Sequence, residues 1–116
     1  MIKTISKIFL TLTLLTSVAF AGEDFTQVRA SHILVSTANE AIQIKKDLDN
    51  GGEFEYYARL YSKCPSGQRG GDLGYFGRGQ MVPEFERKAF ILPIGEVSEP
   101  VFSPFGWHLI KVTGRR

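Results

Sequence analysis

The first 21 residues limit the fold most, because they have the pattern of a targeting segment and leave only the rest of the chain to form a folded domain. Lys3 and Lys7 precede an apolar run over residues 8–15, which is shorter than the roughly 20 apolar residues that cross a bilayer. Ala19-Phe20-Ala21 then has the small-residue spacing of an export-signal cleavage site. We therefore predict a cleavable signal peptide over residues 1–21. The alternative is an uncleaved amphipathic anchor.

The remaining chain has room for one small domain, which we expect over residues 28–116 after a short linker at 22–27. A domain of this size buries only about 60 to 65% of the surface that its unfolded chain exposes. Exported domains of this size often rely on disulfides, but Cys64 is the single cysteine of the sequence and cannot form an internal bridge. The hydrophobic core must therefore stabilise the fold by itself.

The charge balance argues against a nucleic-acid partner. All 12 acidic residues follow residue 21, whereas two of the 14 Lys and Arg residues precede it, so the predicted mature chain is formally neutral. Binding to a phosphate backbone depends on an excess of positive charge, which is absent here. We expect a monomer that binds no nucleic acid and, once the signal is removed, no membrane.

The first half of the domain has the pattern of a strand followed by two helices. Residues 28–35 are rich in β-branched and apolar side chains and predict a strand. Thr37 and Glu40 have capping-box spacing before an apolar helical stripe, and this helix is expected to stop at Gly51-Gly52. Residues 54–61 repeat aromatic and small residues at helical spacing, which predicts a second helix.

The second half predicts further strands with one helix between them. Residues 64–71 have loop composition, and a short strand is expected at 73–76. Pro83 is suited to the first position of a third helix, whose apolar stripe runs to Leu92. Two more strands are expected at 97–102 and 107–113. This order of elements predicts an α+β domain with a small, mostly antiparallel sheet.

His32, His108 and Cys64 are the side chains most able to take part in chemistry near neutral pH. The histidines fall on the first and last expected strands, so their rings would face each other if these strands were neighbours. The simpler interpretation is a pair of hydrogen-bonded core histidines. A zinc site or a thiol hydrolase are sharper alternatives, but metal-ligand spacings such as C-x-x-C are missing and Cys64 lies in a predicted loop. We expect no metal site.

Four motifs follow one another along the domain. They are Ala30-Ser31-His32-Ile33-Leu34-Val35; Cys64-Pro65-Ser66-Gly67 leading into Gly70-Gly71-Asp72-Leu73-Gly74; Gly79-Gln80-Met81-Val82-Pro83-Glu84-Phe85; and Phe105-Gly106-Trp107-His108-Leu109-Ile110. Taken in this order, they closely resemble the parvulin family of peptidyl-prolyl cis/trans isomerases. The resemblance covers nearly all of residues 28–114.

The resemblance implies the parvulin fold, a four-stranded, mostly antiparallel sheet surrounded by about three to four helices. It also implies roles for residues at matching positions. The catalytic positions would be His32, Cys64, Ser103 and His108. The proline pocket would be formed by Leu73, Met81 and Phe85, with Phe76 at its edge.

The function implied is rotation of X-Pro bonds in unfolded or extended proline-containing polypeptides, without a cofactor. Together with the signal, the resemblance implies export to the bacterial periplasm. In the branch of the family that requires phosphoserine or phosphothreonine, basic residues follow the first strand, whereas residues 36–39 here contain none. We therefore expect turnover that does not depend on phosphorylation. A chaperone module that binds the same segments without turnover is the alternative function.

Export processing gives the first testable prediction. We expect the mature protein to begin at Gly22, because the small residues at 19 and 21 suit the signal peptidase. Intact mass of the protein recovered from the exported fraction measures this directly. A main species that retains residues 1–21 would contradict both the cleavage and the soluble mature form.

Overall fold

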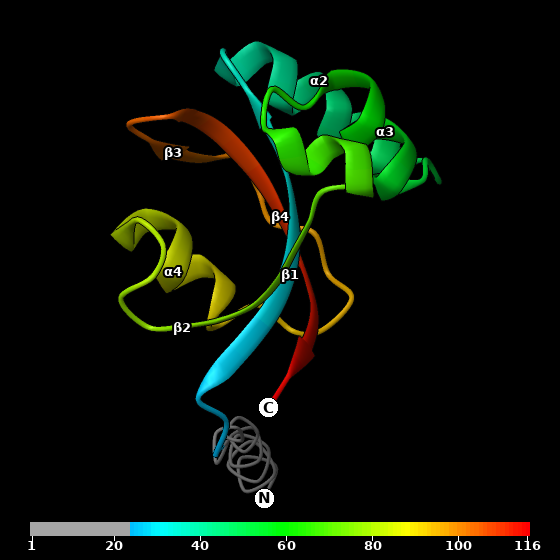
Figure 1. Ribbon diagram of the computed structural model, residues 1–116. Coiled ribbons are helices and arrows are strands. Elements are labelled where there is room, and N and C mark those ends of the chain that lie inside the picture. Colours follow the sequence, from blue (N-terminus) through cyan, green and yellow to red (C-terminus); the bar gives the residue numbers. More distant parts are fainter. Residues whose placement is uncertain (1–23) are drawn as a thin grey trace, which may run out of the picture.

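The computed structural model describes residues 24–116, which form one four-stranded sheet with helices on both of its faces (Figure 1). The predicted signal peptide and its cleavage site lie outside these residues. Of the helices described, none has the length and apolar character needed to cross a membrane. The elements are β1 (Gln27–Val35), α2 (Ala38–Asp49), α3 (Phe54–Tyr61), a 3-10 helix η1 (Pro65–Arg69), β2 (Asp72–Gly77), α4 (Pro83–Ala89), β3 (Val101–Ser103) and β4 (Gly106–Arg115).

The sheet has the strand order β2-β1-β4-β3, so the first and last strands of the chain form its centre. Every strand pair is antiparallel, which confirms the expected sheet. Gln27 and Arg116 exchange backbone hydrogen bonds of 2.8 and 3.0 Å, which tie the two ends of the domain together. The sheet therefore begins at Gln27, within the span expected to be linker, and Phe25 just before it stacks on Phe90 of the core.

Local signals explain where the first two helices begin and end. Thr37 accepts a hydrogen bond from the Glu40 N–H, and the Glu40 carboxylate accepts from the Thr37 N–H, which forms the predicted capping box of α2. After α2, Gly51 has a φ of +103°, a conformation that glycine adopts without the penalty of a Cβ atom. Helix α3 then begins at Phe54, as its aromatic stripe predicts.

Two hydrophobic clusters cover the two faces of the sheet. Alternate residues of β1 supply both, because successive strand residues point to opposite faces. One cluster packs against α4 and contains Val28, Ala30, Phe76, Phe85, Ala89, Phe90, Leu92, Ile110 and Val112. The other packs against α2 and α3 and contains Ile33, Val35, Ala41, Ile44, Phe54, Ala58 and Leu109. Figure 1 shows the separation, with α2 and α3 beside one end of the β1–β4 pair and α4 apart from them.

Three expectations about secondary structure need correction. The predicted loop over 64–71 contains the 3-10 helix η1, which has Pro65 at its first position. Helix α4 ends at Ala89, although the Leu92 N–H still donates to the Lys88 carbonyl and keeps Leu92 buried on the predicted stripe. The predicted strand over 97–102 is divided, because Pro100 has no N–H to donate.

What remains of that strand is two separate contacts with β4. Val97 forms an isolated bridge with Lys111, and β3 then begins only at Val101. Between them, the Ser98 N–H donates to the Ile110 carbonyl at 2.8 Å. The segment thus follows β4 without forming a continuous ladder.

Gly71 holds the end of η1 against the strand that carries His32. Its φ is +90°, and a Cβ atom built on it would lie 2.5 Å from the His32 carbonyl oxygen and 3.3 Å from Ala58 Cβ. Its own carbonyl accepts the His32 N–H at 2.9 Å. No side chain larger than hydrogen fits this contact.

We predict that Gly71→Ala lowers the free energy of unfolding by about 2 to 4 kcal/mol, from the positive φ and the overpacking together. Gly74→Ala is the matched control, because Gly74 has a φ of +74° but no heavy atom within 4 Å of the position that a Cβ atom would occupy. The control should lose only about 1 to 2 kcal/mol. Urea unfolding of both variants measures the difference, and equal losses would contradict the close approach to β1.

Candidate active site

A cavity of about 530 Å³ opens on the face of the sheet that carries α4. It lies between the end of β1, the start of η1, the β2–α4 connection and the turn between β3 and β4. Most of its wall is apolar, with a few polar groups at one side. The lining residues are His32, Leu34, Lys63, Cys64, Pro65, Leu73, Gln80, Met81, Val82, Phe85, Phe105 and His108.

The two histidines form a buried pair at the base of this cavity. The antiparallel register places His32 opposite Ile110 and His108 opposite Leu34, so both rings lie on the same face of the sheet. Their Nδ1 atoms are 3.0 Å apart and the rings are stacked, with centroids 5.2 Å apart. The expectation that the rings meet if the first and last strands are neighbours is confirmed. Phe85 packs edge-on against both rings.

Ser103 extends the pair into a chain of hydrogen bonds and fixes its tautomers. Its Oγ accepts the Phe105 N–H at 3.1 Å and lies 2.7 Å from Nε2 of His108. Ser103 is fully buried, so a hydroxyl that did not donate to Nε2 would be left without an acceptor. His108 therefore carries its proton on Nδ1 and donates it to Nδ1 of His32. His32 then carries its own proton on Nε2.

Burial keeps both imidazoles neutral at physiological pH. Loss of solvation and, to a smaller extent, the proximity of His108 together lower the pKa of His32 to about 4. Burial also lowers the pKa of His108, although the charge of Glu84 acts in the opposite direction. Nε2 of His32 has no hydrogen-bond partner among the residues described. The pair thus leaves one buried N–H donor without a partner among the described residues.

The apolar wall of the cavity contains Leu73, Met81 and Phe85, as the sequence predicts. Phe76 does not reach the cavity. Its side chain is 2% exposed and packs against Phe85 and Phe90, because Phe76 pairs with Val28 on β1 and faces the core. Phe76 therefore supports Phe85 from behind and does not form the edge of the pocket.

Cys64 lies at the polar side of the cavity and is partly exposed. It precedes η1, and its side chain does not cap that helix. Among residues 24–116, no three side chains of the metal-binding types gather closely enough to hold an ion. The arrangement offers an apolar pocket beside a thiol and a neutral histidine pair, which suits binding of a peptide segment better than proton transfer.

Six of the lining residues were not among the predicted site residues, and Lys63 and Phe105 are the two that add a charge and an exposed aromatic ring. Lys63 lies beside Cys64, and its backbone N–H donates to the Leu34 carbonyl at 2.8 Å. Phe105 comes from the turn between β3 and β4 and is 70% exposed. Phe105 could have been predicted, because it is an aromatic residue in a turn between Ser103 and His108. No local signal marks Lys63.

Comparison with known proteins identifies the same domain. Residues 27–114 match the rotamase family, described as the PPIC-type PPIASE domain. Foldase protein PrsA 2 of Bacillus anthracis is 54% identical over 91 residues, which are 78% of this chain and 32% of that protein. Chaperone SurA of Thiobacillus denitrificans is 47% identical over 100 residues, covering 78% of this chain and 23% of that protein.

A solved structure of similar size shows the same fold. The solution structure of NmPin, the parvuline of Nitrosopumilus maritimus, is 44% identical with a TM-score of 0.72, and the match covers 79% of this chain and 100% of NmPin. By contrast, the chain spans a third or less of the PrsA and SurA relatives. The family match runs from the first residue of β1 almost to the last residue of β4 and includes both histidines, Cys64 and the apolar wall. The chain therefore belongs to the rotamase family of PPIC-type peptidyl-prolyl isomerase domains.

Proposed function

We propose that the domain accelerates cis/trans rotation of X-Pro bonds in extended or unfolded polypeptides, without a cofactor. The observation that carries this proposal is the apolar pocket of Leu73, Met81 and Phe85 directly beside a neutral, hydrogen-bonded histidine pair. The pocket suits a proline ring. The polar side then faces the peptide group that precedes the proline.

The reaction needs positioning more than chemistry. Resonance opposes rotation of a peptide bond by about 18 to 20 kcal/mol, and uncatalysed X-Pro bonds take tens to hundreds of seconds to interconvert. Lowering this barrier by about 5 kcal/mol accelerates rotation roughly ten-thousand-fold. Binding the twisted amide more tightly than either planar form supplies that difference. A site lined mainly by apolar side chains favours the twisted amide further, because it is less polar than the resonant form.

The site residues have complementary roles in this proposal. Leu73, Met81 and Phe85 hold the proline ring while the preceding carbonyl turns. Cys64 is a polar neighbour of the turning amide, and no covalent bond forms. His32, His108 and Ser103 fix the polarity of that side through their hydrogen bonds and exchange no protons with the substrate.

Export to the periplasm completes the proposal. It is supported by the signal peptide predicted over residues 1–21 and by the similarity to PrsA and SurA, whose names describe a foldase and a chaperone. The clients would be exported proteins during folding, met by a monomeric domain that binds neither membrane nor nucleic acid. A binding module without turnover is the competing function, and an activity measurement separates the two.

Turnover and phosphorylation independence are tested together in a protease-coupled assay. We expect catalysis with Ala-Pro and Leu-Pro peptides and no gain from phosphoserine before proline, because a phosphate needs several charge-assisted hydrogen bonds. Among the described residues lining the cavity, Lys63 is the only cation. Absence of turnover would refute the isomerase and favour the binding module. Faster turnover of the phosphorylated peptide, lost in Lys63→Ala, would refute phosphorylation independence.

The role of Cys64 is tested by replacement with aspartate. We expect Cys64→Asp to stay within about tenfold of the wild-type rate and Cys64→Ala to lose part of it, because the site asks for a polar group of modest size. A neutral histidine pair also offers no positive charge to a thiolate. Circular dichroism first verifies the fold. A loss of more than about a thousandfold in folded Cys64→Asp would instead identify Cys64 as a nucleophile.

The neutral histidine pair predicts a loss of stability in mild acid. The pKa of His32 is about 4 in the folded protein and near 6.5 when unfolded, so protons bind the unfolded chain first as the pH falls. Its contribution to stability is complete above pH 6.5 and is lost progressively toward pH 4, by about 2 kcal/mol between pH 7 and pH 5.

Urea unfolding at several pH values between 7 and 5 measures this loss. His32→Asn is the comparison variant, because its amide oxygen can still accept the proton that His108 donates. The carboxylates whose pKa is lowered, Asp72 and Glu99, lose their stabilising effect mainly at lower pH. An equally steep loss in His32→Asn would show that other groups cause it.

A further inference from the structure

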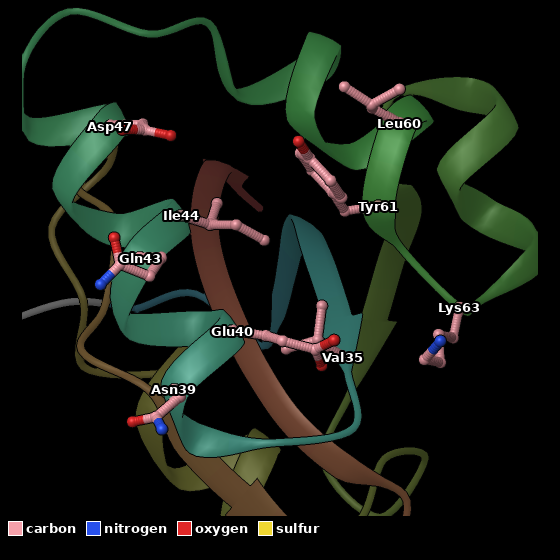
Figure 2. Close-up of a pocket in the computed structure, with 9 residues that line it drawn as sticks. All are labelled: Val35, Asn39, Glu40, Gln43, Ile44, Asp47, Leu60, Tyr61 and Lys63. Atoms are coloured by element: carbon pink, nitrogen blue, oxygen red, sulfur yellow. The ribbon is translucent and has the colours of Figure 1, made fainter.

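A second cavity of about 520 Å³ lies on the other face of the sheet, in the groove between α2 and α3 (Figure 2). It is nearly as large as the cavity of the candidate active site, and the proposed isomerisation does not use it. We call it the α2–α3 groove. Its lining residues are Val35, Asn39, Glu40, Gln43, Ile44, Asp47, Leu60, Tyr61 and Lys63.

The groove has an apolar centre that is open to solvent. Ile44 is 6% exposed and lies in the α2–α3 core cluster, while Leu60 and Tyr61 are 53% and 50% exposed. Figure 2 shows Ile44 and Tyr61 projecting toward the space between the two helices. Contact with an apolar ligand removes the apolar side chains of a concave surface from water, which is favourable. The centre of the groove therefore suits an apolar side chain.

Carboxylates from α2 give the groove a negative wall. Glu40 and Asp47 lie two turns apart on the same helix, and Figure 2 shows Asp47 at the opposite end of the groove from Lys63. The capping hydrogen bonds of Glu40 use only its Oε1. Within residues 24–116, neither carboxylate takes part in an ion pair. A Lys or Arg side chain is the complementary ligand at this wall.

Lys63 connects the groove to the candidate active site, because it lines both cavities. The adjacent residues Leu34 and Val35 line one cavity each, Leu34 the site and Val35 the groove. The Lys63 N–H donates to the Leu34 carbonyl, so Lys63 lies beside the end of β1 where the two faces of the sheet meet. A peptide chain that extended from the site past Lys63 would therefore reach the groove.

We propose that the α2–α3 groove binds the part of a client polypeptide that flanks its X-Pro bond. This inference rests on the proposed function and narrows its substrate class. The flanking segment places an apolar side chain over Ile44 and Tyr61 and a Lys or Arg side chain beside Asp47. Clients with an apolar and a basic residue at a distance from the proline are therefore preferred over short or acidic ones.

The test uses labelled peptides whose affinity is measured by fluorescence anisotropy. A short Ala-Leu-Pro-Phe peptide is compared with versions lengthened by about six residues, which span roughly 20 Å when extended, on either side of the proline. Each extension carries a Leu and either a Lys or a Glu. We expect one of the two Leu-Lys extensions to bind about tenfold more tightly than the short peptide, and its Leu-Glu counterpart to lose most of that gain.

Paired variants place the gain in the groove. Tyr61→Ala removes a groove residue, and Tyr56→Ala is its control, because Tyr56 lies on the same helix, is 52% exposed and also packs against Tyr57, yet lies outside the groove. The ratio of long-peptide to short-peptide affinity should fall about fivefold or more in Tyr61→Ala and stay at the wild-type value in Tyr56→Ala. Asp47→Lys should shift the preference from the Lys extension to the Glu extension.

The affinity ratios do not depend on turnover, so failure of this inference can be distinguished from failure of the proposed function. Loss of X-Pro turnover with every peptide would refute the isomerase while the ratios still report on the groove. The groove proposal is overturned if both Leu-Lys extensions bind no more tightly than the short peptide. It is also overturned if the gain survives Tyr61→Ala as well as it survives Tyr56→Ala.

Discussion

The pairing of β1 with β4 is the interaction on which the rest of this structure depends. It joins the first and last strands of the domain in antiparallel register, so the entropy of closing nearly the whole chain must be recovered by contacts formed along one ladder. Both faces of that ladder are buried under helices, which supplies the stabilisation. The same register brings His32 and His108 onto one face. The fold and the site therefore depend on the same strand pairing.

The buried polar chain from His32 to Ser103 is a demanding feature for a small domain without disulfides. Polar groups removed from water destabilise a core unless each finds a partner. Here the serine hydroxyl and both Nδ1 atoms are paired, and the backbone N–H of Phe105 completes the chain. Neutral imidazoles avoid the much larger cost of burying charge. Within this chain of side chains, Nε2 of His32 is the one atom without a hydrogen-bond partner among the described residues.

The two faces of the sheet offer different binding surfaces. The face with α4 holds an apolar pocket beside the polar chain, and the face with α2 and α3 holds a groove that is apolar at its centre and acidic at its wall. They meet at the end of β1, where the backbone of Lys63 is bonded to that of Leu34. In the function proposed above, one face would hold the proline while the other contacts the chain around it.

The sequence by itself determined the local elements and the family of the fold. The capping box at Thr37 and Glu40, the alternation along β1 and the positions of the helices depend on hydrogen bonds and periodicities that span only a few residues. Pro100 likewise marks the break in the predicted strand, but the position of the break follows from the pairing with β4, which begins again only at Val101. The paired histidines were predicted as facing residues on the condition that their strands were neighbours.

Only the tertiary structure decided which side chains share a cavity. Phe76 lies in the core and not in the pocket, because its pairing with β1 sets the direction of its side chain. Phe105, from a turn, and Lys63, from the connection between two helices, line the pocket instead. The α2–α3 groove likewise arises from two helices packed side by side on one face of the sheet. Cavities are formed by residues far apart in sequence, and no local pattern fixes how the elements that carry them close together.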